Sequence, residues 1–265
     1  VEGWEPELII SNNDFSQDYS AALEGLKTPI NPPRDLGWHI RRKSDFFKNY
    51  NRLAGEFAEI IGEPNWTFSV ATEVFEGFDV NSEESREKLA QRTDAALQFI
   101  RDQYRERGIE GHPHAFIKNN SGTYGLGVVQ VSSGDDVRSW SYKARKKMKA
   151  AKGGGSISEV IIQEGVPTTL KQDDATAEPA LYMVGCQLAG GFLRTHDKKG
   201  PEESLNSPGA VYKRLCVSDL AINISGCPME NVYGWIAKLG FLAIGLEARD
   251  KNINSGRTTP LLEPC

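Results

Sequence analysis

The segment at residues 116–131, FIKNNSGTYGLGVVQV, constrains the fold more than any other part of the chain. Lys118 ends one short apolar run, a loop with three glycines follows, and a valine-rich run comes next. Short apolar runs on either side of a glycine loop predict two antiparallel strands joined as a hairpin. Glycines let backbone N–H groups turn towards one anion, and a lysine adds a charge for phosphate oxygens. The loop therefore fits a phosphate lid, and it fits an ordinary hairpin turn equally well.

Two common phosphate-binding motifs are excluded by the order of residues in this loop. A Walker A loop, G-x-x-x-x-G-K-[ST], requires a lysine after its second glycine. Gly122 and Gly127 have the required spacing, but Val128 occupies the lysine position. A Rossmann fingerprint, G-x-G-x-x-G, opens a helix, whereas this loop reads G-x-x-G-x-G and precedes a β-branched run. A hairpin lid is the phosphate-binding alternative that remains.

Charge and composition exclude several other classes of protein. The 265 residues are 39% hydrophobic and carry a net charge of −5, which predicts one or two domains with a proper core. An acidic chain does not attract nucleic acid or an anionic membrane, so an anionic ligand needs a local site. The basic run at residues 143–152 lacks interleaved aromatic residues, so a solvated helix face explains it better than a nucleic-acid patch. We expect no nucleic-acid partner.

The most apolar long segment, residues 232–246, predicts a buried helix. Lys238 interrupts it, and it is shorter than the roughly 20 residues needed to span a bilayer, so we expect no membrane partner. The chain starts without a methionine, at VEGWEPELIISNND, close to a predicted strand. We therefore expect part of the N-terminal region to be missing.

The cysteines and histidines do not form a recognisable metal or disulfide pattern. No C-x-x-C pair occurs, which argues against a zinc ribbon or a disulfide scaffold and favours a reducing cytoplasm. His112 and His114 have no partner at ligand spacing and are interpreted as loop residues. The widely spaced cysteines are Cys186, Cys216, Cys227 and Cys265.

The rest of the chain mixes helical and strand patterns. Apolar residues at helical spacing predict a helix from about Ser44 to a stop at Gly62. Asn81 with Glu84 resembles a capping box and would start a second helix that ends at Gly108. The other expected elements are strands at residues 7–11, 115–118, 128–131 and 158–163, a basic helix at residues 135–151, and a hairpin of residues 180–184 and 188–194 around Gly185. This pattern predicts an α/β fold with mixed sheets.

Polar residues that could meet a nucleotide lie near the ends of the later strands. Gln163 and Glu164 end the run SEVIIQE, where a linker between two lobes could offer backbone groups to an adenine edge. Glu178 begins the next strand. Arg194 and Asn206 are the groups expected to face a phosphate or carboxylate. Taken singly, each of these residues fits a solvated loop position better than a binding site.

Six segments within residues 37–209 together carry a family resemblance. They are GWHIRRKS, KNNSGTYGLG, VIIQEGV, AEPALYMVG, GGFLRTH and SLNSPG. Their order resembles the ATP-grasp fold, and their residues are similar to those of proteobacterial glutamate–cysteine ligases. The resemblance implies a two-lobed fold. Its expected parts are a partial N-terminal α/β segment at residues 1–62, a small lobe with the glycine-rich lid at residues 63–163, and a large lobe at residues 164–265.

The resemblance also implies roles at the phosphate end of a nucleotide. Lys43 and Lys118 would contact ATP phosphates, while Arg194 and Asn206 would face the transferred phosphoryl group. The residues that would close over the phosphates are Ser121, Gly122, Thr123, Tyr124, Gly125 and Gly127. Lys118, Arg194 and Asn206 are thus the expected catalytic residues.

The resemblance also implies residues that would contact the adenine, the ribose and the substrates. Gln163, Glu164 and Val166 would line the adenine slot, and Glu178 would take the ribose. Arg41 and Arg42 would hold a substrate carboxylate, although a solvent-facing basic cluster at a helix start explains them equally well. The implied reaction joins L-glutamate to L-cysteine with ATP and Mg²⁺.

One departure from the family concerns the residues after Lys118. The family usually has alanine-aspartate-alanine there, whereas this chain has Asn119, Asn120 and Ser121, so one negative charge near the phosphates is missing. The family's carboxylate and amide positions suited to Mg²⁺ fall in the expected missing part, so no metal ligand is assigned. Two alternatives stay open: another ATP-grasp carboxylate–amine ligase such as glutathione synthetase, and a non-catalytic nucleotide-binding remnant. The oligomeric state is not implied.

Overall fold

The computed structural model describes residues 3–121, 125–149 and 157–253. The helices are α1 (Lys43–Ile61), α2 (Glu83–Glu106), α3 (Gly134–Arg138), α4 (Tyr142–Lys149) and α5 (Val232–Asp250). The strands are β1 (Ile9–Ile10), β2 (Ile30–Asn31), β3 (Thr72–Glu76), β4 (Ala115–Asn119), β5 (Val128–Val131), β6 (Glu159–Glu164), β7 (Lys171–Gln172), β8 (Ala175–Val184), β9 (Gln187–His196), β10 (Val211–Leu215), β11 (Ala221–Ile224) and β12 (Cys227–Glu230). Short 3₁₀ helices lie at Ala21–Leu23, Arg34–Leu36, Asn65–Thr67 and Val217–Leu220.

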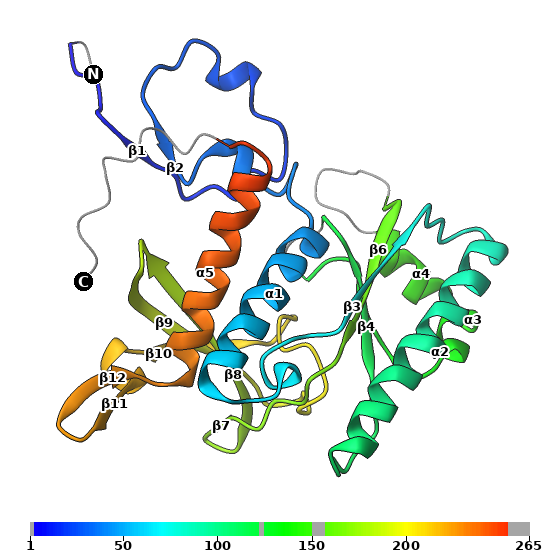
Figure 1. Cartoon of the computed structure of the whole chain (residues 1–265). Helices are drawn as coiled ribbons and strands as arrows, with labels where there is room; N and C mark the ends of the chain where they lie inside the picture. The colour runs from blue at the N-terminus through cyan, green and yellow to red at the C-terminus, as the bar shows by residue number, and fades with distance from the viewer. Residues whose placement is uncertain (1–2, 122–124, 150–156, 254–265) are drawn as a thin grey trace.

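The first sheet has the strand order β3–β6–β4–β5, and its neighbouring strands are antiparallel. Side chains alternate along β4, so Ala115 and Ile117 enter the core while Phe116 and Lys118 lie on the opposite face. The helices α2, α3 and α4 cover the core side of this sheet (Figure 1). The predicted hairpin on either side of the glycine loop is confirmed, because Lys118 lies opposite Val128. The sheet thus leaves one face free for a site.

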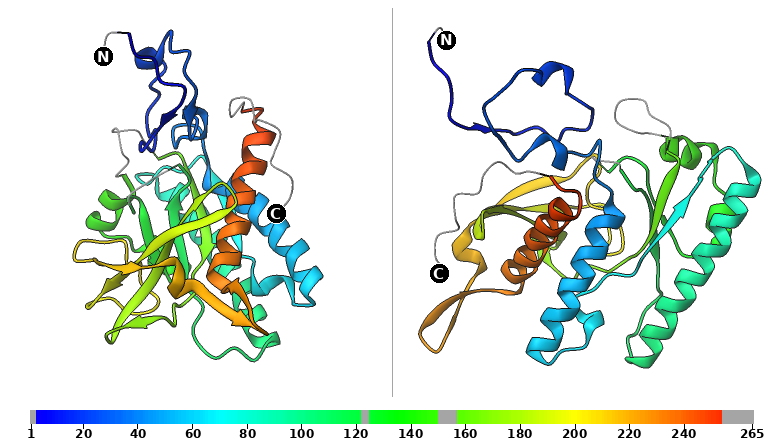
Figure 2. Two further views of the ribbon diagram at one scale, coloured as in Figure 1. Left: turned by 90° about the vertical axis from the view of Figure 1, so that its left-hand side faces the viewer. Right: turned by 45° about the horizontal axis from the view of Figure 1, so that its top comes forward.

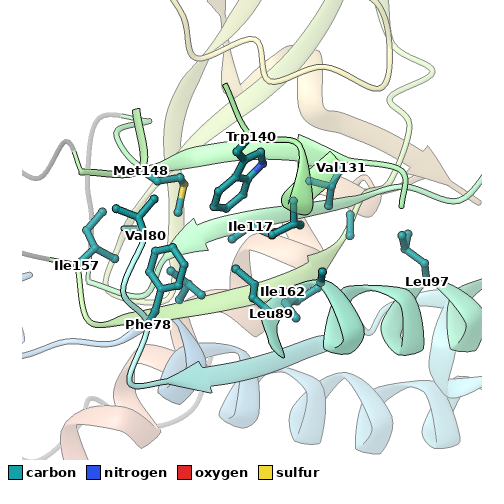
Figure 3. Packing of buried hydrophobic residues seen from close by; sticks show 14 residues of the cluster. Phe78, Val80, Leu89, Leu97, Ile117, Val131, Trp140, Met148, Ile157 and Ile162 are labelled. Carbon is teal, nitrogen blue, oxygen red and sulfur yellow. The ribbon is translucent and has the colours of Figure 1, made fainter. Parts of the chain in front are cut away.

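The core of this lobe is one continuous cluster of buried side chains between the sheet and its helices (Figure 3). Trp140 and Met148 reach this core from the α3–α4 region. The Phe78 and Trp140 rings pack edge to face, with 6.3 Å between their centroids. Burial of these large apolar groups holds the helices against the sheet. The other labelled members are Val80, Leu89, Leu97, Ile117, Val131, Ile157 and Ile162.

The second sheet has the order β10–β9–β8–β7 and is also antiparallel. Its centre is the predicted hairpin, in which Gly185 adopts a φ of 60° at the turn between β8 and β9. Both strands are longer than the sequence pattern predicts. The hairpin therefore extends from the turn to the polar residues that were singled out at its far end.

Helices α1 and α5 lie side by side between the two sheets (Figure 1, Figure 2). α1 contacts β3 of the first sheet, and α5 contacts β8 and β9 of the second. Small residues, Ala54 and Ala243, are fully buried where the helices meet, with Tyr50 and Leu239 beside them. The predicted mixed α/β fold with two lobes is confirmed. The domain boundaries stay predictions.

The basic helix expected at residues 135–151 is wrong in its extent. The chain forms two helices, α3 and α4, and residues 150 and 151 lie outside the described residues. Ser133 caps α3 in a capping box with Asp136, and the Ser141 hydroxyl accepts a hydrogen bond from the Ala144 N–H. The second serine supplies a new helix start that charge and apolar spacing do not reveal.

Two further expectations, for the start of α2 and for the length of β1, need correction. The helix expected to start at a box of Asn81 and Glu84 is capped instead by Ser82, whose hydroxyl accepts from the Ser85 N–H at 3.2 Å. The strand expected at residues 7–11 is shorter, because only β1 pairs with β2. The helix near Ser44 begins at Lys43 and ends at Gly62 as predicted, with Gly62 at a φ of 75°.

The apolar segment at residues 232–246 forms a helix, as predicted, but it is not buried on every side. Gly234, Leu239 and Ala243 are buried, whereas Trp235 and Leu242 are exposed. Among the described helices, none combines the length and the apolar character needed to cross a bilayer. Cys186, Cys216 and Cys227 are free thiols, and Cys265 lies outside the described residues.

Candidate functional site

Lys118 points from β4 onto the face of the first sheet that lies opposite the core. Its Nζ donates to Gln163 Oε1 at 2.6 Å, and it lies 5.2 Å from the centre of the Phe116 ring. Gln163 is fixed in turn, because its Nε2 donates to Thr72 Oγ1 at 2.9 Å. Burial lowers the pKa of Lys118 to about 8, although the Glu178 carboxylate acts in the opposite direction. The sheet therefore holds an ammonium group in a largely neutral setting.

Lys43 reaches the same region from the first residue of α1. Its backbone N–H donates to Asn120 O at 2.9 Å, and its Nζ donates to Asn119 O at 2.8 Å. Burial and then the positive charges of Lys118, Arg41 and Arg42 lower the pKa of Lys43 to about 8. The structure thus brings the two predicted phosphate lysines together from different elements. A polyphosphate beside the two lysines would relieve the repulsion that Lys118 exerts on Lys43.

A cavity of about 170 Å³ lies beside Lys118, between the first sheet and loops of the second lobe. This volume is below the roughly 300–1,000 Å³ of typical ligand pockets, so the cavity suits one ring system. The lining residues are Phe116, Lys118, Val128, Val166, Thr168, Glu178, Pro201, Glu202, Glu203 and Ser204.

Of the three residues expected around adenine, only Val166 lines this cavity. Gln163 is bonded to Lys118, as described above. The Glu164 N–H donates to Ala71 O at 2.9 Å, and the Glu164 carboxylate accepts from the Ala71 N–H at 3.2 Å. Burial raises the pKa of that carboxyl. The Glu164 N–H is therefore engaged within the protein, and the adenine roles of Gln163 and Glu164 stay predictions.

Glu178 and Arg194 face each other across the β8–β9 hairpin. Arg194 Nη1 donates to Glu178 Oε1, while Arg194 Nε is buried without a hydrogen-bond partner among the described residues. Glu178 also lines the cavity beside Lys118. An anion that reached this hairpin could therefore engage the free guanidinium edge of Arg194.

The glycine loop at residues 121–127 is described only at its two ends, because Gly122, Thr123 and Tyr124 lie outside the described residues. Gly125 and Gly127 adopt φ values of 69° and 62°, which other residues rarely adopt. A Cβ on Gly125 would lie 2.9 Å from the backbone oxygen of Asn206.

The first residue of the loop is also fixed. The Ser121 N–H donates to the Asn119 side-chain oxygen at 3.1 Å, so this end of the loop is tied to β4. The structure thus places the loop, the lysine strand and the predicted phosphoryl-facing residue Asn206 close together.

Arg41 does not form the solvent-facing basic cluster that was one of its two interpretations. Its guanidinium binds both carboxylate oxygens of Glu247, at 2.8 to 3.1 Å, and the Glu247 side chain is 1% exposed. A substrate carboxylate at Arg41 would have to displace this contact. Arg42 Nη1 donates to the carbonyls of Ile40 and Arg41 at 3.0 Å, and its guanidinium is half-exposed. The substrate roles of both arginines stay predictions.

A magnesium site is not evident in the part of the chain that the structure describes. Within those residues, no three or more His, Cys, Asp or Glu side chains are grouped so that they could hold a metal ion. Mg²⁺ prefers several oxygen ligands at near-octahedral geometry. At a nucleotide, Mg²⁺ is usually held by one or two carboxylates together with the phosphates, so no metal ligand is assigned among the described residues.

Sequence reasoning missed several residues of this site. Phe116 and Val128 could have been found, because the first shares the face of Lys118 by strand alternation and the second lies opposite it across the hairpin. Trp38, whose ring lies 5.0 Å from the Lys43 ammonium, and the 201–204 loop have no periodic signal. Only tertiary packing brings them to the site.

Comparisons with known proteins agree with the fold and identify the family. The family model described as glutamate-cysteine ligase matches residues 1–248. The chain belongs to the glutamate-cysteine ligase family. None of the curated proteins matches the chain.

A solved structure with a similar fold supports this family assignment. It is a protein from Methylobacillus flagellatus KT that is provisionally named a gamma-glutamylcysteine synthetase. It is 35% identical to this chain with a TM-score of 0.81, over 95% of this chain and 61% of that one. The chain thus spans 61% of the length of this relative. The expected ATP-grasp-like fold is confirmed for this member of the ligase family.

Proposed function

We propose that the protein acts as an ATP-dependent glutamate–cysteine ligase that forms γ-glutamylcysteine, the first step of glutathione biosynthesis. The observation that carries the proposal is that Lys43, bonded to the end of β4 at Asn119, lies close to Lys118, which lines the cavity, in a chain of this family. Polyphosphate recognition requires cations held in place before the ligand arrives. Both ammonium groups are held in this way by hydrogen bonds to neutral protein oxygens.

The proposed reaction has two chemical steps. An oxygen of the glutamate γ-carboxylate attacks the γ-phosphorus of ATP, ADP leaves, and a γ-glutamyl phosphate forms. The cysteine amine then attacks the acyl carbon, phosphate leaves with its electron pair, and the amine loses a proton. A carboxylate is a poor electrophile, so the first step supplies a leaving group, and positioning with charge neutralisation does most of the work.

The chain's own residues would contribute orientation and charge. Lys43 and Lys118 would neutralise phosphate oxygens, and the free edge of Arg194 would meet the transferred phosphoryl group with Asn206. Gly125, which approaches Asn206, would keep the loop close enough to exclude water from the phosphates. Magnesium is expected from the family, and the described residues assign it no ligands.

Product formation and nucleotide binding should be measured separately, with the protein as it exists. ADP release is followed with glutamate and cysteine together, with each omitted, and with γ-glutamylcysteine plus glycine instead. Release that needs both glutamate and cysteine, with γ-glutamylcysteine identified by mass spectrometry, supports the proposal. Release only with γ-glutamylcysteine and glycine would indicate a glutathione synthetase. ATP binding without turnover would indicate a nucleotide-binding remnant.

The variant Lys118→Ala tests the site itself. We expect kcat to fall about a hundredfold or more, because a preorganised charge facing the phosphoryl group is lost. Lys88→Ala is a suitable control, because Lys88 is an exposed lysine of α2 that pairs only with Glu84 at 2.7 Å in the described structure. An unchanged kcat in Lys118→Ala, with the control also normal, would rule out the phosphate role of Lys118.

A further inference from the structure

The most completely buried carboxylate next to the site belongs to Glu247 near the end of α5. Its side chain is 1% exposed, and its only described partner is Arg41, whose Nε and Nη2 both donate to it. Burying a carboxylate is costly unless a cation compensates for it with good geometry. A two-pronged arginine contact from a segment far away in the sequence satisfies that condition. The pair therefore fixes Arg41 against α5.

Arg41 is linked to Lys43 through an aromatic ring. The Arg41 guanidinium lies 4.9 Å from the centre of the Trp38 ring, and the Lys43 ammonium lies 5.0 Å from the same ring. Cations are attracted to the face of an indole, so the ring gives each of them a preferred place. Glu247, Arg41, Trp38 and Lys43 thus form one continuous row of contacts from α5 to the phosphate end of the site.

Several cations gather near the start of α1. The positive charges of Lys118, Arg41 and Arg42 lie close enough to Lys43 to act on it. The Glu247 carboxylate contacts Arg41, which covers both of its oxygens, so it is not exposed to the site. A nucleotide phosphate would therefore not have to compete with a free carboxylate.

We propose that Glu247 is a positioning residue for the nucleotide site, and that it acts through Arg41 and Trp38 to hold the Lys43 ammonium in its binding position. The inference rests on the proposed nucleotide binding. It adds a residue of α5 that touches neither nucleotide nor substrate. It also gives Arg41 a function other than the substrate contact expected from the sequence.

A double-mutant cycle between Glu247 and Lys43 tests the proposal. The dissociation constant for ATP is measured by calorimetry in the parent protein, Glu247→Gln, Lys43→Ala and the double variant, well below each melting temperature. Glutamine keeps the volume and removes the charge. We expect Glu247→Gln to weaken ATP binding about tenfold, and to have less than about a twofold effect in the Lys43→Ala background. A role confined to stability would lower the melting temperature and leave the dissociation constant unchanged.

The control uses another contact between the same two helices. Lys251 of the α5 end donates to the Asp45 carboxylate of α1 at 2.6 Å, where both groups are partly exposed. Asp45→Asn should leave ATP binding unchanged. If Glu247→Gln does not fold, Arg41→Lys serves instead, because lysine keeps a cation beside Glu247 but loses the two-pronged contact. Arg41→Lys should also weaken ATP binding only when Lys43 is present.

The outcomes separate this inference from the proposed function. If Lys43→Ala binds ATP as the parent does, the proposed nucleotide site is wrong and the inference fails with it. If Lys43→Ala weakens binding but neither Glu247→Gln nor Arg41→Lys does, only the positioning role is wrong. Equal effects of Glu247→Gln with and without Lys43 would also overturn it, because Glu247 would then act by another route.

Discussion

At the scale of single residues, the site depends on two lysines that the fold makes poor bases. Lys43 and Lys118 each have a pKa of about 8, chiefly because burial disfavours the ammonium form. An ammonium group that loses its proton easily in the free protein is also the one that a bound anion stabilises most. Phosphate oxygens should raise both pKa values back towards the ordinary lysine range. Nucleotide binding at this site would therefore be coupled to proton uptake.

We predict that ATP binding takes up protons above about pH 8, the pKa of both lysines. Below this pH both lysines are largely protonated before ATP arrives, so little uptake is expected. Above it the bound form holds protons that the free form has lost, so affinity should fall as pH rises. Calorimetry at pH 7 and pH 8.5, in two buffers with different ionisation enthalpies, measures the uptake. Lys118→Ala should reduce it, and equal uptake at both pH values would contradict the assignment.

Gly125 is the second residue-scale test, because both its backbone conformation and its surroundings exclude a side chain. Gly125→Val should raise the KM for ATP, since its φ is 69° and a Cβ would approach Asn206 O to 2.9 Å. Gly77→Val is the matched control, because Gly77 has a similar φ of 66° but nothing within 4 Å of its Cβ position. If both variants change the KM equally, backbone strain rather than the contact with Asn206 is responsible.

At the scale of elements, β4 and α1 are joined by one buried side chain. The first turn of α1 has no cap from its own N-cap residue, Arg42. Asn120, just after β4, supplies the cap instead: its Oδ1 accepts from the Ser44 N–H at 2.9 Å. Its Nδ2 donates to Ser44 Oγ at 2.9 Å and to Glu159 Oε1. The amide thus satisfies a helix start and a carboxylate together, which gives a structural reason for asparagine in place of the aspartate expected from the resemblance.

Asn120→Asp, which introduces the aspartate expected from the resemblance, is predicted to destabilise this protein. The new carboxylate would lie against Glu159 and could not donate to it, so we expect a loss of about 1–3 kcal/mol in the free energy of unfolding. Urea denaturation measures the loss. Adding Glu159→Gln should recover most of it, because the glutamine amide can donate to the aspartate. A stable single variant, or a double variant without recovery, would show that the contact with Glu159 does not decide the residue at position 120.

At the scale of the whole molecule, the candidate site lies where the two sheets and the α1–α5 pair meet. Lys118 comes from the first sheet, Glu178 from the second, and Lys43 from α1. The Glu178 charge acts on Lys118 from across the cavity. A ligand held by all three would link elements that are otherwise connected mainly through α1 and α5. Its binding should therefore stabilise the molecule as a unit.

We predict that ATP raises the melting temperature of the protein. At a concentration one hundred times its dissociation constant, a ligand that binds only the folded state adds about 2.7 kcal/mol to the free energy of unfolding. A thermal shift series against ATP concentration measures the effect. The double variant Lys43→Ala and Lys118→Ala should lose the shift at the same concentrations. A shift that persists in the double variant would mean that ATP binds elsewhere.

The sequence by itself determined the local elements and the family. Apolar runs around glycine predicted the β4–β5 hairpin and the β8–β9 hairpin, because strand alternation and turn residues are local signals. The stop at Gly62 was equally readable, since only glycine readily adopts a left-handed φ. The six motif segments indicated the family, which the family match confirmed. The break between α3 and α4 was missed, because a single serine cap outweighed the basic run.

Only the tertiary structure decided which of the candidate residues meet. Arg41 and Glu247 are 206 positions apart, and nothing in either local sequence indicates that they pair. Burial makes the pairing necessary, because a carboxylate that is 1% exposed must find a cation wherever the fold supplies one. The same holds for Lys43 with Lys118 and for Asn120 with Ser44. The lowered pKa values of the two lysines and the strength of the Asn120–Ser44 hydrogen bonds depend on the exclusion of water. Exclusion of water is a property of the packed molecule and not of any one segment.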